Sequence, residues 1–201
     1  MPISLTQAPE IPPAPVPPRK RWTREECAVF AADGLFERER LELVNGELIS
    51  KMGKNRPHVN AFRLMLIWLQ KTFGSAFVDP EAPIDVSPND NPSSEPEPDL
   101  IVLKRECATF VLGNPQPQDI RLLVEISDST LTYDLSVKAA LYARAGIMEY
   151  WVLDVGGRRL ISHRQPMGGR YASVIIYSEH ESIAPLAAPE SEFSAAQALV
   201  G

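Results

Sequence analysis

Three charged residues, Asp99, Glu125 and Lys138, stand in sequence surroundings that normally exclude charge. Asp99 opens the apolar run "DLIVL" directly after a Pro-rich loop, and Glu125 lies inside "LLVEI", a segment typical of a strand covered on both faces. A buried carboxylate must be neutral, paired with a cation or bound to a metal. Two carboxylates and a backbone carbonyl, for which Ile126 is the candidate, form a ligand set that suits Mg²⁺ or Mn²⁺. Such a cation activates water and neutralises the charge that develops on a phosphodiester.

Lys138 lies on a helix that the sequence predicts from about Tyr133 to Ala145. It shares one face, at the spacing i, i+3, i+4 and i+7, with Leu135, Ala139 and Tyr142. A right-handed crossover would pack this helix back over the strand that carries Glu125. We therefore expect the Lys138 ammonium to lie near the carboxylates, where it can stabilise developing charge or orient a water.

Each of these residues also has a structural interpretation. Asp99 can cap the turn that precedes its strand, and Glu125 can belong to a structural salt bridge. Lys138 can pair with Asp134 at i,i+4 on the surface, an interaction worth only ~0.3–0.5 kcal/mol. Three further residues, Lys54, His58 and Ser127, are candidates for contact with a substrate, although His58 can equally be an exposed residue of a first helical turn.

The elements that position these residues are signalled by local patterns. Thr23 and Glu26 predict a capping box at the start of a helix that ends near Ala32, and Asn45-Gly46 predicts a hairpin turn. The remaining predictions are a helix from Pro57 to Phe73, strands at 76–79, 84–86, 98–103, 122–126, 150–155, 159–164 and 171–177, and a short final helix at 193–199. The last three strands predict an antiparallel C-terminal meander.

Composition predicts one soluble domain. A 201-residue chain with 44% hydrophobic and 23% charged residues can bury one substantial core. We expect a Pro-rich disordered tail at 1–20, a domain at 21–180 and a C-terminal tail at 181–201. No signal peptide and no apolar run of about 18 residues is present. Cys27 and Cys107 form no C-x-x-C pair, so we expect free thiols and a cytoplasmic protein without membrane contact.

The net charge of −6 argues against binding nucleic acid mainly through a basic surface. It leaves open an enzyme that engages phosphates through metal ions, because bound cations reverse the local charge at a carboxylate cluster. The short basic run Arg19-Lys20-Arg21 is either a solvated patch or a phosphate contact.

The segments "EPEPDLIVL" and "LLVEISDSTLTYDLSVKAALYARAGIMEYWVLD" resemble the PD-(D/E)XK nuclease superfamily and, within it, the Uma-type family of restriction endonucleases. The segment "LELVNGELISKM" and His58 resemble the opening part of that family, so the resemblance covers about Trp22 to Tyr177. It implies an α/β fold with a restriction-endonuclease-like mixed β-sheet flanked by helices. It also implies divalent-metal-dependent phosphodiester hydrolysis.

The resemblance assigns roles residue by residue. Asp99 matches the motif aspartate and Glu125 the second acid, while Ser127 occupies the position where a lysine is expected. The resemblance places that lysine on the following helix, as Lys138. An acid from the first element is Glu42 or Glu47, and we prefer Glu47, which follows the Gly of the hairpin turn.

Two functional hypotheses follow. The first is a Mg²⁺- or Mn²⁺-dependent endonuclease, with DNA as the preferred substrate and a homodimer as a plausible assembly, because two-fold symmetry suits cutting of two strands. The second is a catalytically silent nuclease fold that acts as a nucleic-acid-binding or assembly module, motivated by the acidic net charge and the lack of a dedicated DNA-binding domain.

Overall fold

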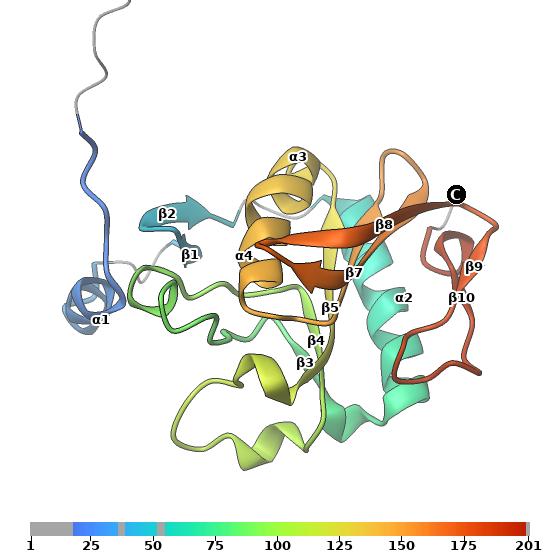
Figure 1. Cartoon of the computed structure of the whole chain (residues 1–201), viewed down its shortest axis with the longest axis horizontal. Coiled ribbons are helices and arrows are strands. Elements are labelled where there is room, and N and C mark those ends of the chain that lie inside the picture. Colours follow the sequence, from blue (N-terminus) through green and yellow to red (C-terminus); the bar gives the residue numbers. More distant parts are fainter. Residues whose placement is uncertain (1–17, 36–38, 52–54, 200–201) are drawn as a thin grey trace, which may run out of the picture.

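A mixed β-sheet forms the central layer of the computed structural model, which describes residues 18–35, 39–51 and 55–199 (Figure 1). In this part of the chain the sheet has six strands in the order β3-β4-β5-β6-β7-β8. The strands are β3 (Val78–Pro80), β4 (Leu100–Leu103), β5 (Ile120–Ser127), β6 (Glu149–Asp154), β7 (Arg159–Met167) and β8 (Arg170–Ser178). Strands β5 and β6 are parallel, and the other neighbours are antiparallel. The predicted fold class, with its C-terminal antiparallel meander, is confirmed.

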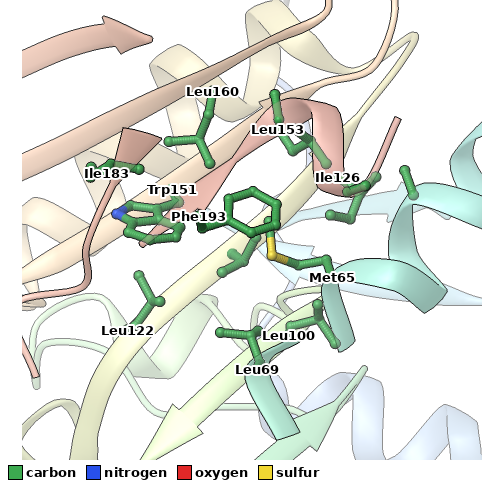
Figure 2. Packing of buried hydrophobic residues seen from close by; sticks show 14 of the residues in the cluster. Met65, Leu69, Leu100, Leu122, Ile126, Trp151, Leu153, Leu160, Ile183 and Phe193 are labelled. Atoms are coloured by element: carbon green, nitrogen blue, oxygen red, sulfur yellow. The ribbon is translucent and has the colours of Figure 1, made fainter. Parts of the chain in front are cut away.

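Helix α2 (Arg56–Phe73) covers one face of this sheet. It begins at the N-cap Asn55, with Pro57 in its first turn, and ends at Gly74, whose φ of 91° favours glycine. Its buried Met65 and Leu69 face the sheet residues Leu100, Leu122 and Trp151 (Figure 2). In the described part of the chain, no helix combines the length and the apolar content needed to cross a bilayer.

The predicted crossover helix, which connects β5 to β6, covers the other face of the sheet. It is not a continuous α-helix. It consists of α3 (Leu131–Tyr133), a π-helical turn η5 (Asp134–Lys138) and α4 (Ala139–Arg144). The Ala139 N–H donates to the Asp134 carbonyl, an i→i+5 bond, and the Tyr150 hydroxyl donates to the same carbonyl at 3.2 Å. Tyr142 and Ala143 pack with Tyr150 and Val152 of β6.

A separate hairpin and the short helix α1 (Arg24–Ala32) lie beside the sheet, at the left in Figure 1. Helix α1 has the predicted capping box, because the Thr23 side chain accepts from the Glu26 N–H and Glu26 accepts from the Thr23 N–H. The hairpin of β1 (Leu41–Val44) and β2 (Glu47–Ser50) turns at Asn45-Gly46, as predicted. The Glu95 N–H donates to the Leu43 carbonyl and ties the hairpin to the loop before β4.

The C-terminal segment differs from the expected tail, because its described part packs on the core. Strands β9 (Ser182–Ile183) and β10 (Phe193–Ser194) pair with each other, and a single 3₁₀ turn, Ala195–Gln197, replaces the predicted helix at 193–199. Phe193 is fully buried and packs against Trp151, with ring centroids 6.2 Å apart (Figure 2). It also packs against Trp68, with ring centroids 4.9 Å apart. Of the Pro-rich N-terminal tail, 1–17 lie outside the described residues.

The prediction of a strand at 84–86 was wrong. The Ile84 N–H donates to the Pro96 carbonyl and the Asp85 N–H donates to the Pro115 carbonyl, so the backbone bonds of this segment go to two different loops. Arg24 also holds Asp85 through an ion pair of 2.7 Å. These single hydrogen bonds satisfy the backbone N–H groups of Ile84 and Asp85 without forming the hydrogen-bond ladder of a β-strand.

Candidate active site

Asp99 lies one residue before β4, beside the end of β5. Since Leu100 is paired with Val124, the Asp99 side chain reaches past the ladder, and its Oδ2 accepts the Ile126 N–H at 2.8 Å. The N–H and C=O of one strand residue point to the same side of the strand. The Ile126 carbonyl therefore also faces the Asp99 side of β5, where β4 has not yet begun.

Lys138 joins two buried glutamates from different elements. Its Nζ donates to Glu125 Oε1 on β5 and lies the same 2.9 Å from Glu42 Oε1 on β1. All three residues are at most 5% exposed. The Tyr142 hydroxyl, one turn further along the helix, donates to the same Glu125 oxygen at 3.1 Å. The structure thus brings together Glu125 and Lys138 as predicted, and excludes the surface alternative for Lys138.

Burial and neighbouring charges shift the proton equilibria of this cluster. Burial raises the pKa of Glu125, and the carboxylates of Asp99, Asp134 and Glu42 add to the rise, while Lys138 opposes it. Burial alone would lower the pKa of Lys138, but the carboxylates around it outweigh this effect and raise the pKa above its usual range. Lys138 therefore stays an ammonium ion at neutral pH, in a site that favours protonation of Glu125.

Asp134, which the sequence offered either as one side of a surface pair with Lys138 or as a residue at the mouth of the site, is a buried carboxylate of the site. Its Oδ2 accepts the hydroxyls of Ser127 and Thr130, the latter at 2.7 Å. Burial raises the pKa of Asp134, whereas Lys138 and the two hydroxyl bonds lower it. The sequence signal for its place in the site is its position four residues before Lys138 and eight before Tyr142, on the same helical stripe.

A pocket of about 300 Å³ opens above these side chains. His58, in the first turn of α2, lines it and holds Nε2 at 3.8 Å from Asp99 Oδ2. The described residues around the pocket include the lysines Lys51 and Lys138 and more than twice as many carboxylates: Glu42, Asp99, Glu125, Asp128 and Asp134. The lining is acidic, which favours a cation over an unaccompanied phosphate.

Two sequence-based choices need correction, and one residue lies outside the described part. Glu47 does not join the cluster: it is exposed beside the hairpin turn, where Arg21 Nη1 donates to its Oε1 at 2.9 Å. Both acids lie on one face of the hairpin, since Glu42 pairs with Ile49 and Glu47 with Val44, but only Glu42 is far enough from the turn to reach Lys138.

Ser127 is fully buried and donates to Asp134, so it does not face a substrate. Lys54 is outside the described residues.

The oxygen donors at this site would suit a hard divalent cation that keeps part of its water shell. Among the described residues, no three His, Cys, Asp or Glu side chains converge on one metal position. Mg²⁺, however, is commonly held by one or two carboxylates and keeps several waters. Asp99, Glu125 and the Ile126 carbonyl are the oxygen donors that would form such a partial shell. Lys138 and Tyr142 both donate to Glu125 Oε1, so Glu125 Oε2 takes no part in these two hydrogen bonds.

Comparison with known proteins gives a family and a fold. The sequence profile of the Uma2 family, described as "Putative restriction endonuclease", matches residues 31–197. One similar solved structure is that of "a putative nuclease belonging to DUF820" from Anabaena variabilis ATCC 29413, with a TM-score of 0.59 and 12% identity over 79% of this chain and 89% of that one. A search of curated proteins found no match.

Proposed function

This chain belongs to the Uma2 family, and we propose that it is a divalent-metal-dependent endonuclease that hydrolyses phosphodiester bonds, with DNA as its substrate. The observation that carries the proposal is the buried Glu42–Lys138–Glu125 cluster beside Asp99, which opens into an acidic pocket. Burying three ionisable side chains together has a high desolvation cost. A metal-binding and charge-stabilising role accounts for such a cluster better than a role in stability does.

Asp99, Glu125 and the Ile126 carbonyl would hold Mg²⁺ or Mn²⁺. The bound cation would neutralise charge on the phosphodiester and lower the pKa of a water ligand. The Asp99 carboxylate is oriented by the Ile126 N–H, which places the side-chain and main-chain oxygens on the same side of β5. An acidic lining without a cation would repel phosphate, so activity should depend on metal.

Lys138 would stabilise the negative charge that develops at the reacting phosphate. Glu42 and Glu125 hold its ammonium in place from two sides, so little reorganisation is needed during the reaction. His58 lies at the pocket beside Asp99 and would contact the substrate backbone.

Plasmid cleavage by the purified full chain tests this proposal. We expect cutting with Mg²⁺ or Mn²⁺ and none with chelator. Asp99→Asn and Glu125→Gln should each lower the rate about 10²-fold or more, the scale seen when one charge-stabilising group is lost.

Glu42→Gln and Glu47→Gln form a matched pair of variants, since only Glu42 touches Lys138. We expect loss in the first and wild-type cutting in the second. Equal cutting by wild type, Asp99→Asn and Glu125→Gln would reject the assignment, and cleavage of RNA alone would correct the substrate.

A catalytically silent module is the second candidate. The observation that favours it is the pairing of Glu125 with Lys138, together with the lack of a preformed three-side-chain metal group among the described residues. Calorimetric titration with Mg²⁺ and Mn²⁺ separates the two. Millimolar or tighter binding that Asp99→Asn removes supports the endonuclease. No binding, combined with retained affinity for DNA, supports the module.

A further inference from the structure

A second pocket, of about 320 Å³, lies between the crossover helix and strands β7 and β8. It shares no lining residue with the pocket described above. Its walls are mostly apolar: Leu135, Ala139, Ala140, Ile161, Val174 and Ile176. A volume of this size with apolar walls and a few polar groups is typical of sites for small organic ligands.

Two polar atoms beside this pocket are buried without a partner. His163 Nδ1 and the Tyr171 hydroxyl find no hydrogen bond among the described residues, although His163 is 4% and Tyr171 7% exposed. Both residues line the pocket, and their rings are in contact, with centroids 5.6 Å apart. Leaving a buried polar atom unpaired costs about 1–3 kcal/mol. Both atoms lie behind the pocket wall rather than on its surface, so a ligand pairs with them only when the wall shifts.

The charge of the lining indicates the sign of that ligand. Two arginines, Arg159 and Arg170, and no Asp or Glu line the pocket among the described residues, although the whole chain carries a net charge of −6. Arg159 pairs with Asp154 through Nε at 2.8 Å, whereas the Arg170 side chain has no ion-pair partner in the described part of the chain. Burial lowers the pKa of His163 to about 4, so the arginines supply the positive charge at neutral pH.

We propose that this pocket binds a small amphipathic anion, with an apolar body against the helix and β8 and a single carboxylate or phosphate group that Arg170 contacts. A shift of the pocket wall lets the Tyr171 hydroxyl and His163 Nδ1 pair with polar atoms of the same ligand. The site is independent of the proposed nuclease centre, because the two pockets have no wall residue in common.

Calorimetry with two ten-carbon probes of opposite charge tests the proposal on the full chain. Sodium decanoate should bind at one site per chain, and decyltrimethylammonium at least about tenfold more weakly, which corresponds to a single charge-assisted hydrogen bond. Arg170→Gln should weaken decanoate binding by about the same factor. Arg63→Gln is the matched control, since Arg63 is an exposed arginine on α2 away from this pocket.

Two further variants address the pocket itself. Ala140→Trp fills it and should abolish decanoate binding while the circular dichroism spectrum stays native. Tyr171→Phe should weaken binding without lowering the free energy of unfolding, because that hydroxyl has no partner within the described chain.

Three results would overturn the proposal. The first is absence of saturable decanoate binding, which would leave water as the occupant. The second is equal binding of both probes, or equal effects of Arg170→Gln and Arg63→Gln. The third is a dimer in sedimentation that Ala140→Trp disrupts, which would make this face a contact with a second copy.

Discussion

Lys138 shows how one residue can organise a site. Its ammonium satisfies Glu42 and Glu125 together, and all three are removed from water. A buried ion cluster rarely stabilises a fold more than apolar side chains of the same shape would, but breaking it by removing one partner is costly. The cluster is therefore better explained by chemistry than by stability, and its energetic consequences can be measured directly.

Lys138→Met should destabilise the protein by about 3–5 kcal/mol at pH 7, because two buried glutamates lose their common cation. Urea unfolding at pH 7 measures this. Lys71→Met, at an exposed position of α2, should change little. A loss below about 1 kcal/mol at pH 7 would mean that the cluster is solvated rather than buried.

Glu125 gives the protein a pH dependence of its own. Its pKa is raised from 4.5 to about 8, so between these values the folded state binds more protons than the unfolded state. Stability should therefore fall as the pH rises through this window in the absence of divalent cations. Glu125→Gln should remove this contribution, so the stability of the variant relative to wild type should increase with pH. Parallel stability curves for the two proteins would contradict the raised pKa.

At the scale of elements, the interrupted crossover helix and the hairpin bring the site together. The Asp134 carbonyl accepts from both Ala139 and Tyr150, and the resulting π turn has Asp134 and Lys138 as its two ends, both buried. Such π turns are frequent at functional sites. The hairpin brings Glu42 to Lys138, whereas β5 brings Glu125, so the geometry of the hairpin turn controls the position of one of the three cluster residues.

Gly46→Ala should destabilise the hairpin by about 1–2 kcal/mol, the cost of a left-handed conformation for a residue with a side chain. Gly46 has a φ of 76°, and an added Cβ would lie 2.9 Å from Arg21 Cβ. Under the proposed function, cleavage should fall as well, because Glu42 lies on the same hairpin. Urea unfolding and the plasmid assay measure the two effects. Gly113→Ala is the control, since nothing lies within 4 Å of its added Cβ. Equal behaviour of the two variants would contradict the role of this turn.

At the scale of the whole molecule, two segments that are far apart in the sequence cover one face of the sheet. They are helix α2 and the C-terminal segment, whose Phe193 packs against both Trp68 and Trp151. The described C-terminal segment thus supports the face of the sheet opposite to the crossover helix, which makes residues 182–199 part of the folding unit.

Phe193→Ala should lower the free energy of unfolding by about 3–5 kcal/mol, the usual cost of deleting a buried aromatic side chain. Tryptophan fluorescence should report the change, because Trp68 and Trp151 contact the removed ring. Leu186→Ala, in the same segment but 53% exposed, should cost little. Similar losses in the two variants would show that the segment does not pack on the core.

The sequence by itself determined the local elements and most of the cluster. The capping box at Thr23, the turn at Asn45-Gly46 and the helix that ends at Gly74 depend on interactions between near neighbours, which a linear pattern displays directly. Glu125 and Lys138 were identifiable because charge inside an apolar period requires a partner. These inferences needed only the periodicity of strands and helices and the crossover rule.

Only the tertiary structure decided which side chains meet. Glu42 rather than Glu47 reaches Lys138, because the choice depends on how far each lies from the hairpin turn and on how the hairpin docks. The burial of Asp134, the π turn and the packing of Phe193 arise from contacts between distant segments, such as Tyr150 with the Asp134 carbonyl. The sequence pattern did not predict the π turn or the packing of Phe193, because part of their energy comes from partners far away along the chain, such as Tyr150, which is 16 residues from Asp134.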